Sequence, residues 1–164
     1  MTVREIRLYG DPVLLTVAAE VTDFGDATHS LAADLVDTVL LPGRAGLAAP
    51  QIGVSRRAFS YNVDEQVGVV FNPVVVARDG EQTGDEGCLS VPELWYPIRR
   101  SLHVVVEGMD ADGAPVRVEG TELMARCLEH EVDHLDGVVY LHRLDRDARR
   151  AAMRAVRESD WFNR

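Results

Sequence analysis

The sequence predicts an α+β domain in which antiparallel or mixed β-sheets surround one central helix, with a further helix toward each end of the chain. Three observations lead to this prediction. Segments rich in valine and other strand-forming residues fill the middle of the chain. A strongly periodic helix follows them at residues 121–135. Because the strands precede this helix instead of alternating with helices, a βαβ series is disfavoured.

The length and composition of the chain indicate how many domains it forms and where in the cell it is expected. A chain of 164 residues with 46% hydrophobic and 27% charged residues can bury a core, and we expect one domain over residues 1–164. The first twenty residues contain no apolar run suited to a signal peptide or a membrane span. Two cysteines, Cys88 and Cys127, argue against a disulfide framework in such a chain. We therefore expect a cytoplasmic protein that is not membrane-bound.

The elements before the central helix follow from apolar spacing and turn residues. A helix is predicted at residues 28–41, ended by Pro42 and Gly43. Strands are predicted at 58–63, 68–76, 102–108 and 116–119, and the last two form a hairpin through the turn at 110–115. Two glycine-containing segments, 45–53 and 84–92, fit neither pattern. The first is too apolar for an ordinary surface loop, so we expect its backbone to run close to another part of the molecule.

The central helix carries the most informative motif, His130-Glu131-Val132-Asp133-His134. Residues four apart lie on one face of a helix, so the imidazoles of His130 and His134 can converge on one metal ion. Glu131 lies at the edge of that face, where a general base that is not itself a ligand must stand. Two polar histidines without a metal are the alternative. Apolar positions at helical spacing and Gly137 as a C-cap favour a buried, rigid helix, which suits a metal site.

A catalytic metal site usually has three protein ligands, so one more is needed. Cys127 shares the histidine face, but its short side chain cannot reach a metal held beyond two imidazole tips, and we expect it to line the pocket. Cys88 can approach from another element, because the glycines around it permit a tight backbone path. Glu158 is the alternative, since metallopeptidases of the thermolysin type take a glutamate from a later helix. Too little chain follows it for the second lobe of such a peptidase.

Charge separates the end of the chain from the rest. The formal net charge of −10 argues against DNA or general nucleic-acid binding. The segment at 143–157 nevertheless holds six arginines against two aspartates. Asp145 is a candidate N-cap for a last helix from Arg146 to Arg157, with alanines and Val156 as its inner face. Its basic side is either simply solvated or a contact for an anionic partner.

Together, three segments resemble the ordered motifs of the peptide deformylase family of bacterial type. The opening of the chain, with Gly10-Asp11-Pro12, resembles the family as well, so the likeness covers nearly all residues. The three motif segments are Gly46-Leu47-Ala48-Ala49-Pro50-Gln51, Glu86-Gly87-Cys88-Leu89-Ser90 and His130-Glu131-Val132-Asp133-His134. Three motifs in the right order are far more specific than any one of them.

The resemblance implies a role for each matching residue. Cys88, His130 and His134 would bind the metal, and Glu131 would be general base and acid. Gln51 and the backbone N–H of Leu89 would stabilise the oxyanion. The substrate would contact Gly46, Gly87, Leu89 and Cys127. Glu86 is expected to pair with Arg100 and hold the cysteine loop, with an ordinary surface ion pair as the alternative.

The resemblance also implies the reaction and the metal. The reaction is hydrolysis of the N-formyl group from the N-terminal formyl-methionine of newly made polypeptides, with release of formate. The metal would be one divalent ion, Fe²⁺ first, with Zn²⁺, Ni²⁺ or Co²⁺ able to substitute. The C-terminal helix would then be a candidate ribosome contact. Competing interpretations are a small metallopeptidase and a non-catalytic metal-binding protein that docks through its arginine-rich helix.

One residue departs from the family pattern. Arg44 stands where the first motif usually begins with a glycine. We expect its guanidinium to point to solvent, and the alternative is that it recruits acidic residues of a substrate. Trp95 and Tyr96 are candidates for the rim of the same pocket, although aromatic residues near a proline-containing turn are more often part of local packing.

Overall fold

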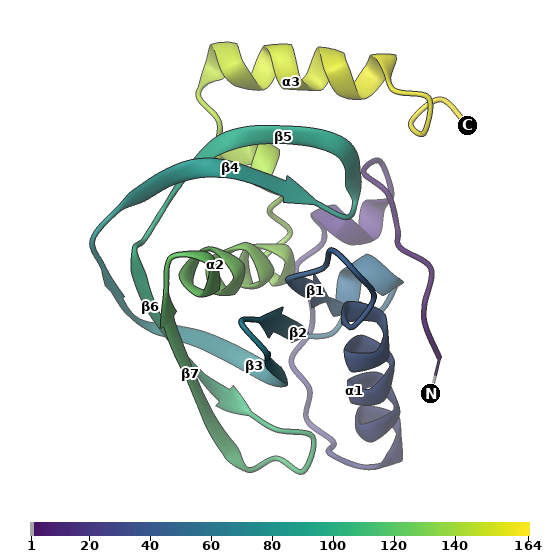
Figure 1. Ribbon diagram of the computed structural model, residues 1–164. Coiled ribbons are helices and arrows are strands. Elements are labelled where there is room, and N and C mark those ends of the chain that lie inside the picture. The colour runs from purple at the N-terminus through teal and green to yellow at the C-terminus, as the bar shows by residue number, and fades with distance from the viewer. Residues whose placement is uncertain (1) are drawn as a thin grey trace.

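The computed structural model describes residues 2–164 and shows the predicted α+β architecture (Figure 1). Three α-helices, three short 3₁₀ helices and seven strands follow one another along the described chain. The helices are α1 Asp26–Val39, α2 Leu123–Leu135 and α3 Arg146–Glu158, with the 3₁₀ helices η1 Pro12–Leu15, η2 Ala49–Ile52 and η3 Tyr140–Arg143. The strands are β1 Gly46–Ala48, β2 Ala58–Val63, β3 Gln66–Asp79, β4 Gln82–Cys88, β5 Val91–Arg100, β6 His103–Met109 and β7 Pro115–Thr121.

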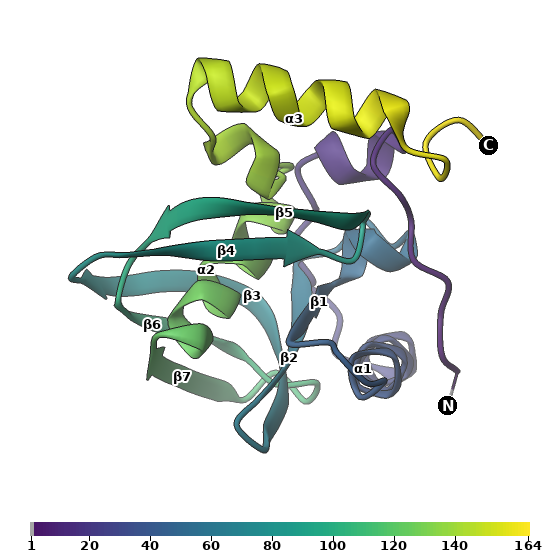
Figure 2. The same cartoon turned by 45° about the horizontal axis from the view of Figure 1, so that its top comes forward.

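The strands form two antiparallel sheets around α2. Five strands pair in the order β1-β2-β3-β6-β7, and β4 and β5 pair as a separate hairpin. Figures 1 and 2 show α2 between the hairpin and the concave side of the larger sheet, with α1 beside β1 and β2 and α3 at the outer edge next to β5. The central helix therefore has protein on nearly every side.

The burial of α2 explains why its sequence period was so strong. Leu128 and Leu135 are fully buried and belong to one apolar cluster with Phe59 and Val104 of the larger sheet. The helix starts two residues later than predicted, because Thr121 ends β7. Gly137 follows the helix with φ of +73°, the left-handed conformation expected of a glycine after a helix end. Packing against the larger sheet and a defined C-terminal turn therefore fix the position of α2.

Helix α1 confirms the first predicted helix and packs on the other side of β1 to β3. Leu35 and Val39 are fully buried against this sheet, whereas Leu40, predicted to be internal, is half exposed just beyond the helix. The hydroxyl of Ser60 on β2 donates to the carbonyl of Leu35 at 2.9 Å and ties the strand to the helix. This packing fixes the position of β1, which carries the first motif.

The β4–β5 hairpin was not predicted and is the main difference from the sequence-based expectation. The motif segment at 84–92 reads as a loop because glycines and polar residues replace the usual apolar alternation. In the structure the inward positions of the hairpin include Glu86 and Arg100, both buried. These paired charges interrupt the apolar positions of the hairpin, of which Val91 and Ile98 are buried, so the alternation of hydrophobic and polar residues is too weak to reveal it.

Helix α3 agrees closely with its predicted bounds. The predicted N-cap is present, since the Asp145 side chain accepts a bond from the Ala148 N–H at 2.9 Å. Ala152 and Val156 form its buried face, but Ala151, predicted to be internal, is exposed. Within residues 2–164, none of the helices combines the length and the apolar character needed to cross a bilayer.

Candidate active site

Three side chains from two elements converge beside α2. Cys88 at the end of β4 places its Sγ 3.4 Å from Nε2 of His134. Nε2 of His134 lies 3.2 Å from Nε2 of His130. The three potential ligand atoms all lie within 4.8 Å of one another. One thiol and two imidazoles are a ligand set suited to a divalent transition metal.

The His130 ring is fixed by a carboxylate behind it. Its Nδ1 lies 2.7 Å from Oε2 of Glu86, which leaves Nε2 facing the ligand cluster. Glu86 also receives two bonds from the Arg100 guanidinium, at 3.0 and 2.7 Å. Burial by itself raises the pKa of Glu86, but the hydrogen bonds from Arg100 and His130 outweigh it and hold that pKa below its usual range. The predicted Glu86–Arg100 pair is therefore present, and it is buried, not a surface ion pair.

Glu131 lies on the neighbouring face of α2 and is 3% exposed. Its Oε2 is buried and has no hydrogen-bond partner among the described residues. Burial raises the pKa of this carboxyl to about 7. A carboxylate with an unpaired buried oxygen next to three ligand atoms is poised to accept a proton from a molecule bound there.

Cys127 and Gly46 show why the first glycine-containing segment runs so close to the helix. The Cys127 Sγ lies 3.3 Å from the carbonyl oxygen of Ala45, outside the ligand cluster, as expected. A Cβ placed on Gly46 would lie 2.5 Å from Oε1 of Glu131 and 2.8 Å from Sγ of Cys127. Only glycine fits between β1 and α2, which confirms the prediction that this backbone approaches another element closely.

Gln51 reaches the cluster from the 3₁₀ helix after β1. Its Oε1 accepts a bond from the Ala48 N–H at 2.9 Å, so its Nε2 is directed toward Ser90 Oγ at 3.1 Å and Cys88 Sγ at 3.6 Å. Leu89 follows Cys88 in the turn between β4 and β5 and lines the same cavity. An amide nitrogen and a turn backbone thus flank the thiol.

A cavity of about 340 Å³ opens onto these groups. Its lining includes Gly46, Gly87, Leu89, Cys127 and Glu131, so the structure brings together the residues that the sequence singled out. Its size falls within the usual range for a small-molecule or side-chain pocket.

The rim of the cavity contains Arg44 and Trp95, whose roles the sequence left open. The Tyr96 ring instead packs near Tyr140. Trp95 is 66% exposed, and its ring covers Gly87 so closely that a Cβ there would lie 2.8 Å from the ring. Arg44 does not point simply to solvent. Its Nη1 donates to the carbonyl of Thr38 at 3.0 Å, in the last turn of α1, where unpaired carbonyls and the helix dipole favour a cation.

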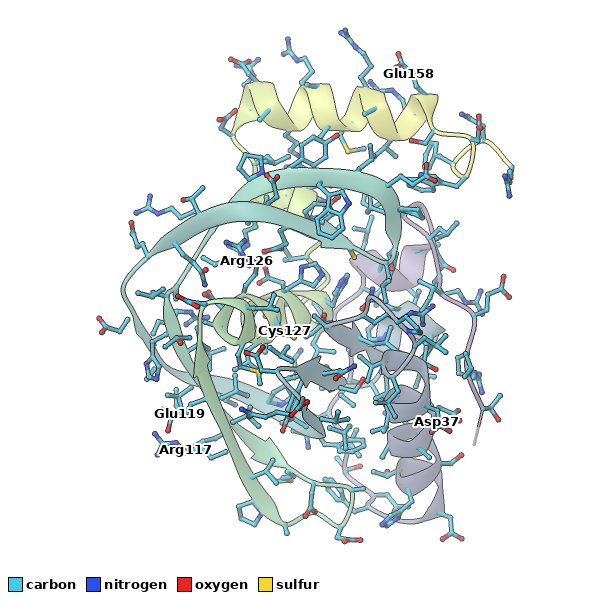
Figure 3. All side chains as sticks on the ribbon, in the orientation of Figure 1. Asp37, Arg117, Glu119, Arg126, Cys127 and Glu158 are labelled. Atoms are coloured by element: carbon cyan, nitrogen blue, oxygen red, sulfur yellow. The ribbon has the colours of Figure 1, made fainter. Side chains whose placement is uncertain are left out.

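Sequence reasoning missed Arg126 and Asp133. The Arg126 guanidinium lies between α2 and the hairpin, while Cys127 lies on the side of α2 toward β1 (Figure 3). Arg126 donates to Glu86 Oε1 at 2.9 Å and to the Ile98 carbonyl at 3.0 Å. Asp133 accepts from Nη1 of Arg100 at 2.7 Å. The available signal was the presence of two further charged residues on a helix that the sequence already predicted to be buried.

The fold and the site are those of a metal-dependent hydrolase: three side chains that could hold a metal ion lie beside a cavity and a carboxylate oxygen that has no partner among the described residues. The model of the polypeptide deformylase family matches residues 3–150. A peptide deformylase of Acidothermus cellulolyticus is 52% identical over 161 residues, which is 98% of this chain and 89% of the relative. Peptide deformylase 1 of Corynebacterium glutamicum is 47% identical over 169 residues and the full length of both chains.

Solved structures give the same answer. A crystal structure of peptide deformylase from Thermus thermophilus matches with a TM-score of 0.88 and 43% identity, over 94% of this chain and 93% of that one. The enzyme from Legionella pneumophila matches with a TM-score of 0.89 and 34% identity, over 96% and 95%. This chain belongs to the polypeptide deformylase family. It is an enzyme that removes the N-formyl group from formyl-methionyl polypeptides.

Proposed function

We propose that this chain performs deformylation with Cys88, His130 and His134 as the ligands of one divalent metal ion and Glu131 as the general base. The convergence of the three ligand atoms within 4.8 Å of one another carries this proposal. Two further features support it. Glu86 orients His130 so that Nε2 faces the cluster, and the buried Oε2 of Glu131 has no partner among the described residues. Both features fit a cation with a reactive molecule beside it.

The identity of the metal is a separate part of the proposal. One thiolate and two imidazoles suit Zn²⁺ by ligand type, and Ni²⁺ or Co²⁺ also fit such a set. Similarity to the family favours Fe²⁺ as the metal used in the cell. Bound at this site, the ion would supply Lewis acidity toward water and toward the formyl carbonyl oxygen.

The chain's own residues account for the proton transfers. Glu131 takes a proton from the attacking water as the new carbon–oxygen bond forms at the formyl carbon. It then delivers that proton to the methionine nitrogen as the carbon–nitrogen bond breaks, which leaves a free amine and formic acid. The formic acid ionises to formate at neutral pH. The pKa of about 7 that burial gives Glu131 suits a group that must both accept and donate a proton near neutral pH.

Gln51 and Leu89 stabilise the negative charge that develops on the formyl oxygen. The Gln51 amide is held by its bond to the Ala48 N–H, so its Nε2 is oriented before substrate arrives. The backbone N–H of Leu89 offers the second donor from the turn after Cys88. Two fixed donors at a buried site stabilise an oxyanion more strongly than mobile water does.

The cavity beside the cluster receives the methionine side chain. Its wall includes Leu123, Leu89 and Cys127, which offer an apolar surface to an unbranched thioether. Gly46 and Gly87 line the same cavity, and neither adds a side chain that would narrow it. One catalytic domain over residues 1–164 is sufficient for this arrangement.

The direct test is formate release from a short formyl-Met-Ala peptide by protein purified without oxygen and analysed for its metal content. We expect one equivalent of formate per peptide and one metal ion per chain. Unformylated Met-Ala-Ser with an internal peptide bond serves as the control substrate. Cleavage of that internal bond without formate release would identify a metallopeptidase. Stoichiometric metal with neither activity would identify a non-catalytic metal-binding protein.

A second proposal concerns where the enzyme meets its substrate. Helix α3 presents Arg146, Arg149, Arg150, Arg154 and Arg157, all exposed and without an ion pair among the described residues. Figure 1 shows this helix at the outer edge of the molecule. Such a basic face suits a salt-sensitive contact with ribosomal RNA, where formyl-methionyl chains emerge. A cytoplasmic location follows from the same substrate and is part of this proposal.

A further inference from the structure

Arg143 stands apart from the other arginines of the C-terminal segment. It ends η3, just before α3, and its guanidinium turns toward α2 instead of outward. Its Nη2 lies 2.7 Å from Oδ1 of Asp133, and its Nε lies 3.1 Å from Oδ2. This is a bidentate pair, the geometry in which arginine fixes a carboxylate most firmly.

Asp133 connects Arg143 to buried residues of the site. Its Oδ2 also accepts from Arg100 Nη1 at 2.7 Å, and Arg100 in turn holds both oxygens of Glu86. Glu86 then bonds to Nδ1 of His130 at 2.7 Å. A continuous chain of charge-assisted hydrogen bonds therefore runs from Arg143 to a metal ligand.

Exposure falls along this chain of bonds. The Arg143 side chain is 49% exposed, that of Asp133 is 11% exposed and that of Arg100 is 3% exposed. Alternating charges bonded in series at low dielectric strengthen one another and restrict one another's rotamers. Among these bonded residues, Arg143 alone has substantial access to water.

We propose that Arg143 is a positioning residue for the metal site, which it stabilises through Asp133, Arg100 and Glu86 by keeping His130 in ligand geometry. This inference rests on the proposed ligand set. Groups that hold metal ligands typically affect metal affinity by about 10- to 100-fold. Arg143 acts through intermediate residues, so we expect a smaller effect, about threefold to tenfold on the rate of metal release.

Arg78 on β3 provides a matched control, because it pairs with a carboxylate on the same helix. Its side chain is 54% exposed, and its Nε lies 3.3 Å from Oε2 of Glu129, which is 13% exposed. Glu129 precedes His130 by one residue, as Asp133 precedes His134. Its other oxygen accepts from the Ser101 N–H at 2.6 Å, so this pair stays outside the chain of bonds that ends at His130. Replacing either Arg78 or Arg143 by Gln removes one ion pair between an arginine and a carboxylate of α2.

The experiment compares Zn²⁺-loaded wild type, Arg143→Gln, Arg143→Lys and Arg78→Gln in an excess of a chromogenic chelator. Absorbance follows zinc release, and thermal unfolding of each metal-free protein is measured separately. We expect Arg143→Gln to release zinc about threefold to tenfold faster, Arg143→Lys to lie between it and wild type, and Arg78→Gln to match wild type. A purely structural role would lower the thermal midpoint of the metal-free protein and leave zinc release unchanged.

Two results overturn the inference. One is an Arg143→Gln release rate within twofold of wild type. The other is equal acceleration by Arg78→Gln, which would mean that any loosening of α2 has this effect. Failure of the wild type to bind zinc would instead contradict the proposed ligand set, so the two failures are distinguishable.

Discussion

The site around α2 and the surface helix α3 are both rich in charged residues, but their charges behave in opposite ways. Arg100 is buried and bonds to two carboxylates, whereas the arginines from Arg146 to Arg157 face water without ion partners among the described residues. A buried charge that loses its partner is strongly destabilising, while an exposed one contributes little. The effect of replacing an arginine therefore depends on where it lies.

Removal of a ligand should have the largest effect at the buried site. Cys88→Ala should empty the metal site and reduce formate release to background, because two imidazoles alone hold the ion weakly. Cys127→Ala should keep its metal, since its thiol lies outside the ligand cluster. Metal analysis of both purified variants checks this expectation. Equal metal loss in the two variants would contradict the separate roles of the cysteines.

Removal of the base should cost activity without emptying the site. Glu131→Gln should keep nearly the full metal content and lower turnover by a factor on the order of 10² to 10⁴, the usual contribution of a general base. The amide fills the same volume, so the fold should be unchanged. Metal content and formate release are measured on one preparation. Loss of metal in this variant would show that the carboxylate is a ligand.

Disruption of the buried charge chain should appear as lost stability. Arg100→Met leaves Glu86 and Asp133 with fewer donors, and breaking a buried ion network typically costs about 3–5 kcal/mol. Urea unfolding of the metal-free protein measures the change. Arg99→Met is the control, because Arg99 is its exposed neighbour on β5 and, within residues 2–164, pairs only with exposed Glu81. Similar losses in both variants would remove the contrast between buried and exposed arginines.

The smallest effect on catalysis is expected on α3. Changing Arg149, Arg150 and Arg154 together to Gln should leave turnover of a short formyl peptide unchanged and stability within about 0.5 kcal/mol for each position. The same variant should co-sediment less with ribosomes at low salt, because each lost cation weakens contact with phosphate. Binding that does not change would leave the helix with an ordinary solvated face.

Elements that bury mainly apolar residues were predicted from the sequence, and the element that buries charged residues was not. Leu128 and Leu135 gave α2 a clear helical period, and Ala58–Val63 was predicted with its observed bounds. The hairpin of β4 and β5 was missed because it buries the charged residues Glu86 and Arg100 alongside its few apolar ones, which breaks the alternating pattern of a strand. Arg44 was expected in solvent, but it bonds to the Thr38 carbonyl. Such partners lie on other elements and leave no periodic signal.

The sequence by itself determined the elements and the chemical inventory of the site. His130 and His134 share a face because helical geometry is local, and Cys88 stood out because few other residues could complete the ligand set. Only the tertiary structure decided that Arg143 turns inward to Asp133 while its neighbours on α3 face water. Side-chain pairing between distant segments depends on how the helices and sheets pack, and residue spacing along one segment carries no record of it.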